Sequence, residues 1–398
     1  MRLRPSAIVL FVFLHLSGCA SNPLKLGVIS DVHYLSEKLL DTHRNTGVEE
    51  TPAILDAVLS DYMHSDIDAL LIAGDMTWYG ERKSHVELVE KLRPLMDKGV
   101  RIFVAPGNHD VNIPMASEKI SPAEFVEIYR DCGYASAIRR DTASLSYVAA
   151  LNDKTWLLAL DACRYKEYTS TSISGGKLTD SSEMWLLETL ADAKKQNITV
   201  VAMLHHGLVE HFPFQSNLFP QYLIDDWRRL AGLLADNGLK AVFTGHFHAN
   251  DVSEFISGSG NKIYDIETGS LSAYPFPYRF VELTDKELNI STRNLTSIPS
   301  NPDLYAAGKA KLKAWARNLG EQKIRAKNLA PNESILSQMA DIAADMMLLH
   351  VAGDEALSDS LQQKIVKVAE DMEFPMQLTP ENIQIDTPPV DNNVRLSF

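Results

Sequence analysis

The sequence predicts an α/β domain followed by a helical C-terminal region, on the basis of three observations. Short apolar runs alternate with stretches of helical periodicity from residue 24 to about residue 290. Several of these runs lead directly into polar side chains, as strands do at the ligand-binding edge of an α/β sheet. After about residue 295 the strand-like runs stop and amphipathic stretches follow. A chain of 398 residues has room for one large domain and a smaller one.

The N-terminus has the pattern of an exported bacterial lipoprotein. Arg2 and Arg4 precede an apolar run over 7–16, which is too short to span a bilayer and is typical of a signal peptide. The quartet Leu16-Ser17-Gly18-Cys19 resembles a lipobox. The resemblance implies that 1–18 are removed and that a lipid on Cys19 anchors the protein, on the periplasmic side of the outer membrane or at the cell surface. The alternative is an ordinary signal peptide with an accidental cysteine.

Six apolar runs are predicted to form buried strands, because they are four to eight residues long and end in Gly, Pro or Asp. They span 24–30, 69–73, 100–105, 155–161, 198–204 and 239–244. Helices are predicted between them. One opens at Thr51-Pro52, where a capping residue precedes a proline at the first helical position, and another covers 183–195.

Three amphipathic stretches predict a helical subdomain over 300–375. They begin at Asn301-Pro302, Glu333 and Leu357. The first places Leu312, Trp315 and Leu319 on one face, which predicts that the helical region packs either on the main domain or on a second subunit. The methionines of the second indicate a core rather than a cofactor site. Residues 376–398, rich in Pro and Asn, are predicted to form an extended tail.

Polar clusters follow five of the predicted strands. These clusters are Asp31-Val32-His33, Gly74-Asp75, Gly107-Asn108-His109-Asp110, His205-His206 and Gly245-His246-Phe247-His248. A Gly-Asp pair alone is ordinary turn chemistry, but five clusters in order at strand ends indicate a shared site. Carboxylate, imidazole and amide oxygen ligands suit Mn, Fe or Zn, and the lack of cysteine argues against a closed structural zinc site. Asp31 and Asp75 supply enough negative charge for two cations, which together can clamp a displacement at phosphorus.

This series of motifs resembles the calcineurin-like metallophosphoesterase superfamily. The resemblance covers roughly residues 24–290 and predicts a domain over 24–297. It implies a four-layer αββα sandwich with a dinuclear metal site. The implied ligands are Asp31, His33 and His248 for the first metal, Asn108, His205 and His246 for the second, and Asp75 as the bridge. His109 matches the family's catalytic histidine, which stabilises or protonates the departing oxygen while a hydroxide between the metals attacks phosphorus.

The fourth cluster departs from the family pattern, because His205-His206-Gly207-Leu208 lacks the usual prolines. The strand end favours His205 as the ligand and leaves His206 near the substrate. Asn112 is a candidate for orienting a phosphate oxygen. Four other nearby residues are Tyr34, Trp78, Tyr79 and His211. The aromatic residues either stack on a base or pack in the core, and the histidine either lines the site or lies at the surface or at a helix cap.

Four stretches resemble bacterial proteins described as cyclic-nucleotide phosphodiesterases, which also carry a C-terminal helical extension. They lie at 30–36, 106–112, 145–147 and 204–208. The implied function is hydrolysis of small phosphodiesters such as cyclic nucleotides. The alternatives are a phosphomonoesterase or nucleotidase, and a catalytically silent binding protein on the same fold.

Charge and cysteine content restrict the partners further. A net charge of -14 weighs against a nucleic acid polymer, because affinity for such polymers rests on Lys and Arg. A small phosphate ester is the expected substrate. Cys132 and Cys163 are compatible either with a disulfide in an oxidising compartment or with two free thiols.

Overall fold

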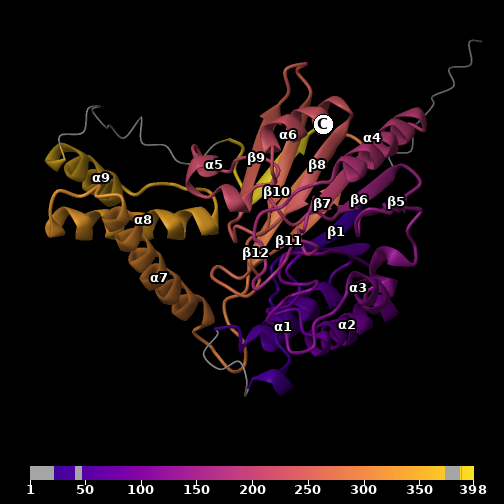
Figure 1. Ribbon diagram of the computed structural model, residues 1–398, viewed down its shortest axis with the longest axis horizontal. Coiled ribbons are helices and arrows are strands. Elements are labelled where there is room, and N and C mark those ends of the chain that lie inside the picture. The colour runs from indigo at the N-terminus through magenta and orange to yellow at the C-terminus, as the bar shows by residue number, and fades with distance from the viewer. Residues whose placement is uncertain (1–21, 41–46, 373–385, 387) are drawn as a thin grey trace, which may run out of the picture.

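Two facing β-sheets form the centre of the molecule (Figure 1). The computed structural model describes residues 22–40, 47–372, 386 and 388–398. The first sheet has the strand order β13-β12-β11-β1-β2-β3, and the second has the order β4-β5-β6-β7-β8-β10-β9. Helices cover the outer face of each sheet, which confirms the predicted four-layer α/β sandwich with a helical C-terminal region.

The first sheet combines a parallel centre with an antiparallel edge. Its strands are β1 (Leu24–Ile29), β2 (Ala69–Ala73), β3 (Arg101–Ala105), β11 (Pro277–Leu283), β12 (Glu287–Asn294) and β13 (Asn393–Ser397). The β1, β2 and β3 strands are parallel and read as continuous apolar runs, because both of their faces are covered. The antiparallel β11–β13 edge is not predicted from the sequence.

The second sheet is arranged in the same way, with β6, β7, β8 and β10 parallel. Its strands are β4 (Arg139–Arg140), β5 (Tyr147–Asn152), β6 (Thr155–Leu160), β7 (Thr199–Leu204), β8 (Leu239–Thr244), β9 (Asp251–Ile256) and β10 (Lys262–Glu267). All six strands predicted from apolar runs are present within one residue of their predicted limits.

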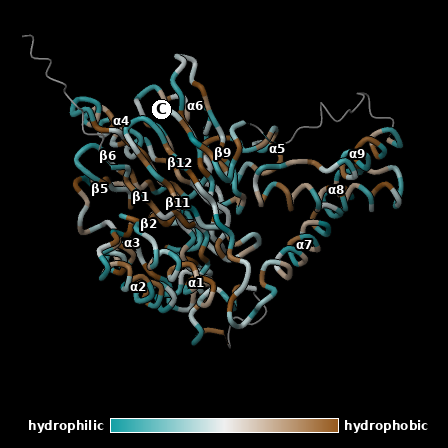
Figure 2. The backbone as a smooth tube through the Cα atoms, turned by 180° about the vertical axis from the view of Figure 1, so that it is seen from behind, coloured by the Kyte–Doolittle hydropathy of each residue, from teal (hydrophilic) through white to brown (hydrophobic). Residues whose placement is uncertain are grey.

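Apolar side chains fill the space between the layers, and Figure 2 shows hydrophobic residues along the strands and along the helices that cover them. The helices of the sandwich are α1 (Thr51–Met63), α2 (Arg82–Asp97), α3 (Pro122–Ile128), α4 (Asp180–Lys195), α5 (Gln215–Leu218) and α6 (Trp227–Asp236). Leu186 and Leu190 of α4 and Leu230 and Leu234 of α6 are buried in the cluster on the outer face of the second sheet. Helices α1 and α2 contribute to the cluster around the first sheet.

Three helices extend to one side of the sandwich (Figure 1). They are α7 (Leu304–Ala326), α8 (Glu333–Ala352) and α9 (Asp359–Asp371). The end of α8 returns to the sandwich, where the Val351 carbonyl accepts a hydrogen bond from the Asn250 amide. Among the described residues, α8 alone has the length and apolar composition of a membrane-spanning helix, a test that core helices of soluble proteins also pass.

Two features of the C-terminal region differ from the sequence prediction. Trp315 is 54% exposed, because α7 turns a different stripe toward its neighbours. The buried residues of α7 are Leu304, Ala316 and Ile324, and Gly320, between the last two, lets α8 approach closely. The last residues of the chain form β13, which pairs with β12 and so belongs to the first sheet.

Cys132 and Cys163 are both free, which answers the question that the sequence left open. Cys132 is buried, and the Cys163 thiol donates a hydrogen bond to the Pro106 carbonyl at 3.3 Å.

Candidate metal centre

The five polar clusters follow β1, β2, β3, β7 and β8, and their side chains meet at one edge of the two sheets. Five residues of these clusters have left-handed backbone conformations. They are Asp31, His33, Asp75, His246 and His248, with φ between 46° and 78°. Such conformations are strained for residues other than glycine and cluster at functional sites. The turns at the strand ends therefore place these side chains at a cost in backbone energy, a signal that the sequence does not carry.

Asp31, His33 and His248 form the first group of converging ligand atoms. His248 Nε2 lies 3.1 Å from Asp31 Oδ1 and 3.3 Å from His33 Nε2. The Asp31 Oδ2 atom is held on its other side by the Ser30 hydroxyl at 2.6 Å and by the His246 amide at 2.9 Å. Two imidazole nitrogens and a carboxylate oxygen facing one point match the donor set of a borderline divalent cation.

Asp75, His205 and His246 form the second group, with Asn108 beside them. His205 Nε2 is 3.3 Å from Asp75 Oδ2 and 3.2 Å from Asn108 Oδ1. Backbone carbonyls engage the opposite ring nitrogens, since His205 Nδ1 meets the Ala73 carbonyl at 2.9 Å and His246 Nε2 meets the Gln221 carbonyl at 3.1 Å. Outer contacts of this kind fix the orientation and tautomer of metal-binding histidines. They leave Nε2 of His205 and Nδ1 of His246 for a cation.

Asp75 connects the two groups. Its Oδ2 atom lies 3.3 Å from His205 Nε2 and 3.9 Å from His33 Nε2, so one oxygen faces both groups. Its Oδ1 atom accepts a hydrogen bond from the His109 amide at 2.8 Å. Burial opposes ionisation of Asp75, yet the surrounding histidines hold its pKa well below the usual value. A carboxylate that stays ionised between two sets of ligands is suited to bridge two cations.

Two glycines of the clusters are required by the close approach of the carboxylates. A Cβ atom on Gly107 would lie 2.1 Å from Asp75 Oδ1. A Cβ atom on Gly245 would lie 1.9 Å from Ser30 Oγ and 2.4 Å from Asp31 Oδ2. The loops at Gly107 and Gly245 therefore pack directly against the Asp75 and Asp31 carboxylates. Together, the carboxylate, imidazole and amide ligand atoms of the two groups fit a dinuclear metal centre.

His109 lies beside the two groups and keeps a partly exposed side chain. Its Nδ1 atom contacts the Trp78 carbonyl at 2.6 Å, an acceptor that requires a proton on Nδ1. Its Nε2 atom lies 4.0 Å from Asp75 Oδ2 and therefore faces the centre. An imidazole held in this way is available to exchange a proton with a bound substrate.

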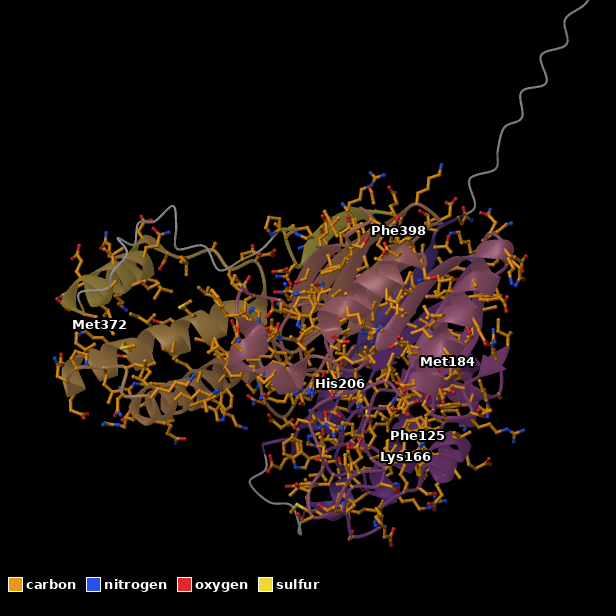
Figure 3. All side chains as sticks on the ribbon, turned by 45° about the horizontal axis from the view of Figure 1, so that its top comes forward. Phe125, Lys166, Met184, His206, Met372 and Phe398 are labelled. Carbon is orange, nitrogen blue, oxygen red and sulfur yellow. The ribbon has the colours of Figure 1, made fainter. Side chains whose placement is uncertain are left out.

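The remaining predicted residues differ in their surroundings. His206, labelled in Figure 3, is fully buried and contacts the Ser174 carbonyl through Nε2 at 2.9 Å. Asn112, three residues after His109 in the sequence, is half-buried. A substrate role for either stays a prediction. Tyr34 is packed in the core, whereas Trp78 and Tyr79 are partly exposed.

His211 is neither at the surface nor among the two groups of candidate ligands. It is buried, and its Nδ1 atom lies 2.9 Å from Glu267 Oε2 and 3.5 Å from Asp251 Oδ1. These carboxylates hold the pKa of His211 well above its ordinary value despite burial.

Asp110 belongs to the third predicted cluster, but the sequence does not predict its supporting role. Asp110 accepts hydrogen bonds from the amides of Gly107 at 2.8 Å and Thr77 at 3.1 Å, and so ties together the loops that carry the second and third clusters. Burial and the nearby Asp75 raise its pKa to about 7. The presence of Asp110 directly after His109 is the one signal that the sequence offers for this role.

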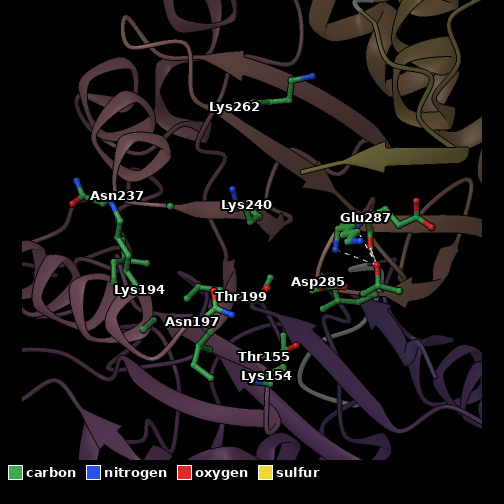
Figure 4. A pocket seen from close by; sticks show the side chains of 18 of the residues that line it. Lys154, Thr155, Lys194, Asn197, Thr199, Asn237, Lys240, Lys262, Asp285 and Glu287 are labelled. Atoms are coloured by element: carbon green, nitrogen blue, oxygen red, sulfur yellow. Dashed lines mark hydrogen bonds between the residues drawn. The ribbon is translucent and has the colours of Figure 1, made fainter. Parts of the chain in front are cut away.

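A cavity of about 1160 Å³ lies at the opposite ends of the strands (Figure 4). Its lining includes Thr155 and Thr199, the first residues of β6 and β7. Lys154, Lys194 and Lys240 line the cavity together with Asp285 and Glu287, so the lining carries both signs of charge. None of the predicted ligands lines this cavity.

The sequence matches the model of the calcineurin-like phosphoesterase family over residues 24–250. No curated protein matches it. Among solved structures, a dimetal phosphatase from Danio rerio is 12% identical with a TM-score of 0.47, over 69% of this chain and 97% of that chain. A purple acid phosphatase from yellow lupin (Lupinus luteus) seeds is 12% identical with a TM-score of 0.44, over 68% of this chain and 51% of that chain.

A third solved structure, the NAD nucleotidase of Haemophilus influenzae, is 12% identical with a TM-score of 0.37, over 68% of this chain and 49% of that chain. The family assignment rests on the sequence match, which covers more than half of the chain and includes all five clusters. The family implies two divalent metal ions and metal-dependent hydrolysis of phosphoesters. The chain belongs to the calcineurin-like phosphoesterase family.

Proposed function

We propose that this protein hydrolyses small phosphodiesters, with cyclic nucleotides as the leading substrate class. The observation that carries the proposal is the position of Asp75, whose Oδ2 atom faces both groups of ligands while His109 lies next to it. Asp31, His33 and His248 would hold one cation, and Asn108, His205 and His246 would hold the other. When bound, a pair of divalent cations polarises phosphoryl oxygens and lowers the pKa of water.

The role proposed for His109 follows from its two contacts. The Trp78 carbonyl keeps the proton on Nδ1 and fixes the ring, while Nε2 points toward the space beside Asp75. A protonated Nε2 would donate to the ester oxygen as its bond to phosphorus breaks, and would be reprotonated from solvent through its exposed edge. Positioning of the ring by a backbone carbonyl makes this geometry independent of the charge on other side chains.

Aromatic side chains at both ends of the centre favour a diester over a monoester. The Trp78 ring lies 5.2 Å from the ring of His33, in the first group. The Tyr222 ring lies 4.9 Å from the ring of His246, in the second, and also 4.9 Å from the Phe247 ring. A diester has two organic arms, and a base or other apolar group on each would find an aromatic surface, worth about 1–3 kcal/mol per stacked base.

The deciding experiment is a hydrolysis screen on protein reconstituted with Mn, Zn or Fe. We expect kcat/KM for bis-p-nitrophenyl phosphate to exceed that for p-nitrophenyl phosphate at least tenfold, with cyclic nucleotides cleaved faster than linear mononucleotides. The reverse order would identify a phosphomonoesterase or nucleotidase. Absence of turnover in protein that holds two metals per chain would identify a binding protein on this fold.

The His109→Ala variant tests the proton transfer separately from metal binding. We expect two metals per chain, as in the parent, and a loss of kcat of about 10²–10⁴ on alkyl esters, whose leaving groups need a proton. The loss should be much smaller on p-nitrophenyl esters, whose leaving group is stable as an anion. Equal losses on both ester types would show that His109 acts otherwise.

We also propose that the mature protein is lipid-anchored through Cys19, which lies outside the described residues. The support is the signal-peptide pattern and the Leu16–Cys19 quartet. An external location would favour scavenging of phosphate from nucleotides or lipid-derived diesters. Mass spectrometry of the N-terminal peptide should show lipid on Cys19, and Cys19→Ala should release the protein from membranes. An unprocessed Met1 in the parent would refute this proposal.

A further inference from the structure

A second cluster of acidic side chains, separate from the two groups of candidate ligands, lies where three parts of the chain meet; its members are buried except for the half-buried Asp386. Asp251 begins β9, Glu355 follows the end of α8, and Asp386 and Asp391 belong to the segment before β13. Carboxylate oxygens of Glu355, Asp386 and Asp391 all lie within 4.8 Å of one another. Like charges at this separation repel strongly in a buried position unless a cation lies between them.

Glu355 is the member of the cluster that indicates a missing partner. Its side chain is only 2% exposed. Its Oε1 atom accepts a hydrogen bond from His350 Nδ1 at 2.6 Å, but its buried Oε2 atom has no hydrogen-bond partner in the part of the chain that the structure describes. A buried carboxylate oxygen without a partner costs free energy, because it has lost water and gained nothing in exchange.

Among the described residues, the basic side chains near this point already have partners. Arg279 donates to the carbonyls of Asp391 at 2.7 Å and Glu267 at 2.6 Å, rather than to the carboxylates. His350 uses Nδ1 for its hydrogen bond to Glu355, while its Nε2 has no hydrogen-bond partner among the described residues. The pKa of Asp391 is raised to about 7 and that of Asp386 to about 6, in both cases by burial and by neighbouring carboxylates.

We propose that Glu355, Asp386 and Asp391 hold one hard divalent cation of the Ca²⁺ type, separate from the two catalytic ions. The ligands are all oxygens, as Ca²⁺ prefers, and Ca–O distances of about 2.3–2.6 Å allow ligand atoms to lie nearly 5 Å apart across the ion. Asp391 is already oriented for this role, since its Oδ1 accepts from the Val252 amide at 2.8 Å and its Oδ2 from the Asp354 amide at 2.6 Å. Each oxygen keeps a lone pair for the ion.

The site would join the end of α8 and the C-terminal segment to β9, three residues after His248. Its expected role is therefore to hold the helical region and β13 on the sandwich. A ligand that binds only the folded state stabilises that state by mass action. Ca²⁺ should therefore raise the free energy of unfolding of the whole chain.

The test uses full-length protein whose catalytic centre is first saturated with Mn. Titration with Ca²⁺, followed by calorimetry and by elemental analysis after gel filtration, should show one Ca²⁺ per chain beside two Mn. Saturating Ca²⁺ should raise Tm by at least about 2 °C. Glu355→Gln and Asp386→Asn should each weaken Ca²⁺ binding at least tenfold and leave two Mn per chain. Glu370→Gln, which neutralises an exposed carboxylate on α9, is the matched control and should bind Ca²⁺ as the parent does.

The proposal also predicts the sign of the difference in Tm between Glu355→Gln and the parent, both without and with Ca²⁺. Without Ca²⁺, Glu355→Gln removes a repelling charge, so its Tm should equal or exceed that of the parent. With Ca²⁺, the order should reverse, because only the parent gains stability. Absence of Ca²⁺ binding to the Mn-saturated parent would overturn the proposal, and so would an equal Ca²⁺ effect on the parent and on Glu355→Gln.

Discussion

At the residue scale, the choice between His205 and His206 as a metal ligand depends on which ring nitrogen is free. His205 directs Nε2 toward Asp75 and Asn108. His206 turns away and contacts the Ser174 carbonyl instead. We expect His205→Ala to lower the metal content from two ions per chain to about one, whereas His206→Ala keeps two. Elemental analysis of both variants measures this, and loss of metal in His206→Ala alone would reverse the assignment.

A second residue-scale prediction concerns pH and stability. His85 is buried, its Nδ1 lies 2.8 Å from the Tyr129 hydroxyl, and its Nε2 lies 3.0 Å from the Asp110 carbonyl. A neutral ring satisfies both contacts, and burial lowers the His85 pKa from 6.5 to about 3. Between pH 6.5 and pH 3 the unfolded state binds more protons than the folded state. The free energy of unfolding therefore falls as the pH falls below about 6.5, and His85 contributes at most about 1.4 kcal/mol per pH unit to this fall.

The measurement is urea unfolding of metal-loaded protein between pH 7.5 and 4.5. His85→Gln should be less stable than the parent at pH 7.5, because it loses buried hydrogen bonds, and should depend less steeply on pH. Parallel pH profiles for the two proteins would contradict this prediction.

The identities of the candidate ligands can be predicted from sequence, but their supporting contacts cannot. His33, Asp75 and His248 are recognisable because they follow apolar runs in a fixed order. The carbonyls that fix the histidine rings come from Ala73, Trp78 and Gln221, and a backbone carbonyl has no signature in a sequence. The same applies to the left-handed φ angles of the ligands, which the packing of the loops imposes.

At the scale of single elements, the loop after β8 depends on Gly245. An added Cβ would meet the Ser30 hydroxyl and the Asp31 carboxylate, so Gly245→Ala must displace one of them. We expect loss of the first metal, a large loss of turnover and a lower Tm. Gly258→Ala, in the β9–β10 connection, is the matched control, because nothing lies within 4 Å of its added Cβ. Metal content and Tm near parent values in both variants would show that the loop has room to adjust.

Elements buried on both faces are easier to predict than elements buried on one. The β2 strand reads Ala-Leu-Leu-Ile-Ala and is entirely buried, and its apolar run suffices. The β12 strand reads Glu-Leu-Asn-Ile-Ser-Thr-Arg-Asn and buries only Leu288 and Ile290, so its alternation is short and easily missed. In the helical region, the periodicity of the sequence predicts that α7 is a helix but does not predict which of its faces is packed. Ala316 and Gly320, rather than Trp315, lie on the packed face.

At the scale of the whole molecule, the chain closes its first sheet with its last residues. The β13 strand pairs with β12 across about a hundred residues that include the whole helical region. Local composition does not predict such a pairing, because the Pro- and Asn-rich segment before β13 has the pattern of a tail. What holds it is contact with buried groups that lie far away in sequence.

Arg279 makes the main contact that holds the segment before β13. It is fully buried on β11 and donates to the Asp391 carbonyl at 2.7 Å, the Thr292 hydroxyl at 3.0 Å and the Glu267 carbonyl at 2.6 Å. Burial lowers its pKa to about 10, so it stays charged at neutral pH beside the acidic cluster. Arg279→Met leaves these three acceptors without their donor, and we expect a loss of about 3–5 kcal/mol in the free energy of unfolding.

The matched control is Arg395→Met, on β13 itself. Arg395 is exposed and pairs with Glu287 at 2.6 Å, and a surface pair of this kind contributes at most about 1 kcal/mol. Urea unfolding should therefore separate the two variants clearly, and limited proteolysis should cut the segment before β13 faster in Arg279→Met. Equal unfolding midpoints would mean that β13 is held by strand pairing alone, in which case the buried arginine serves the acidic cluster and not the closure of the sheet.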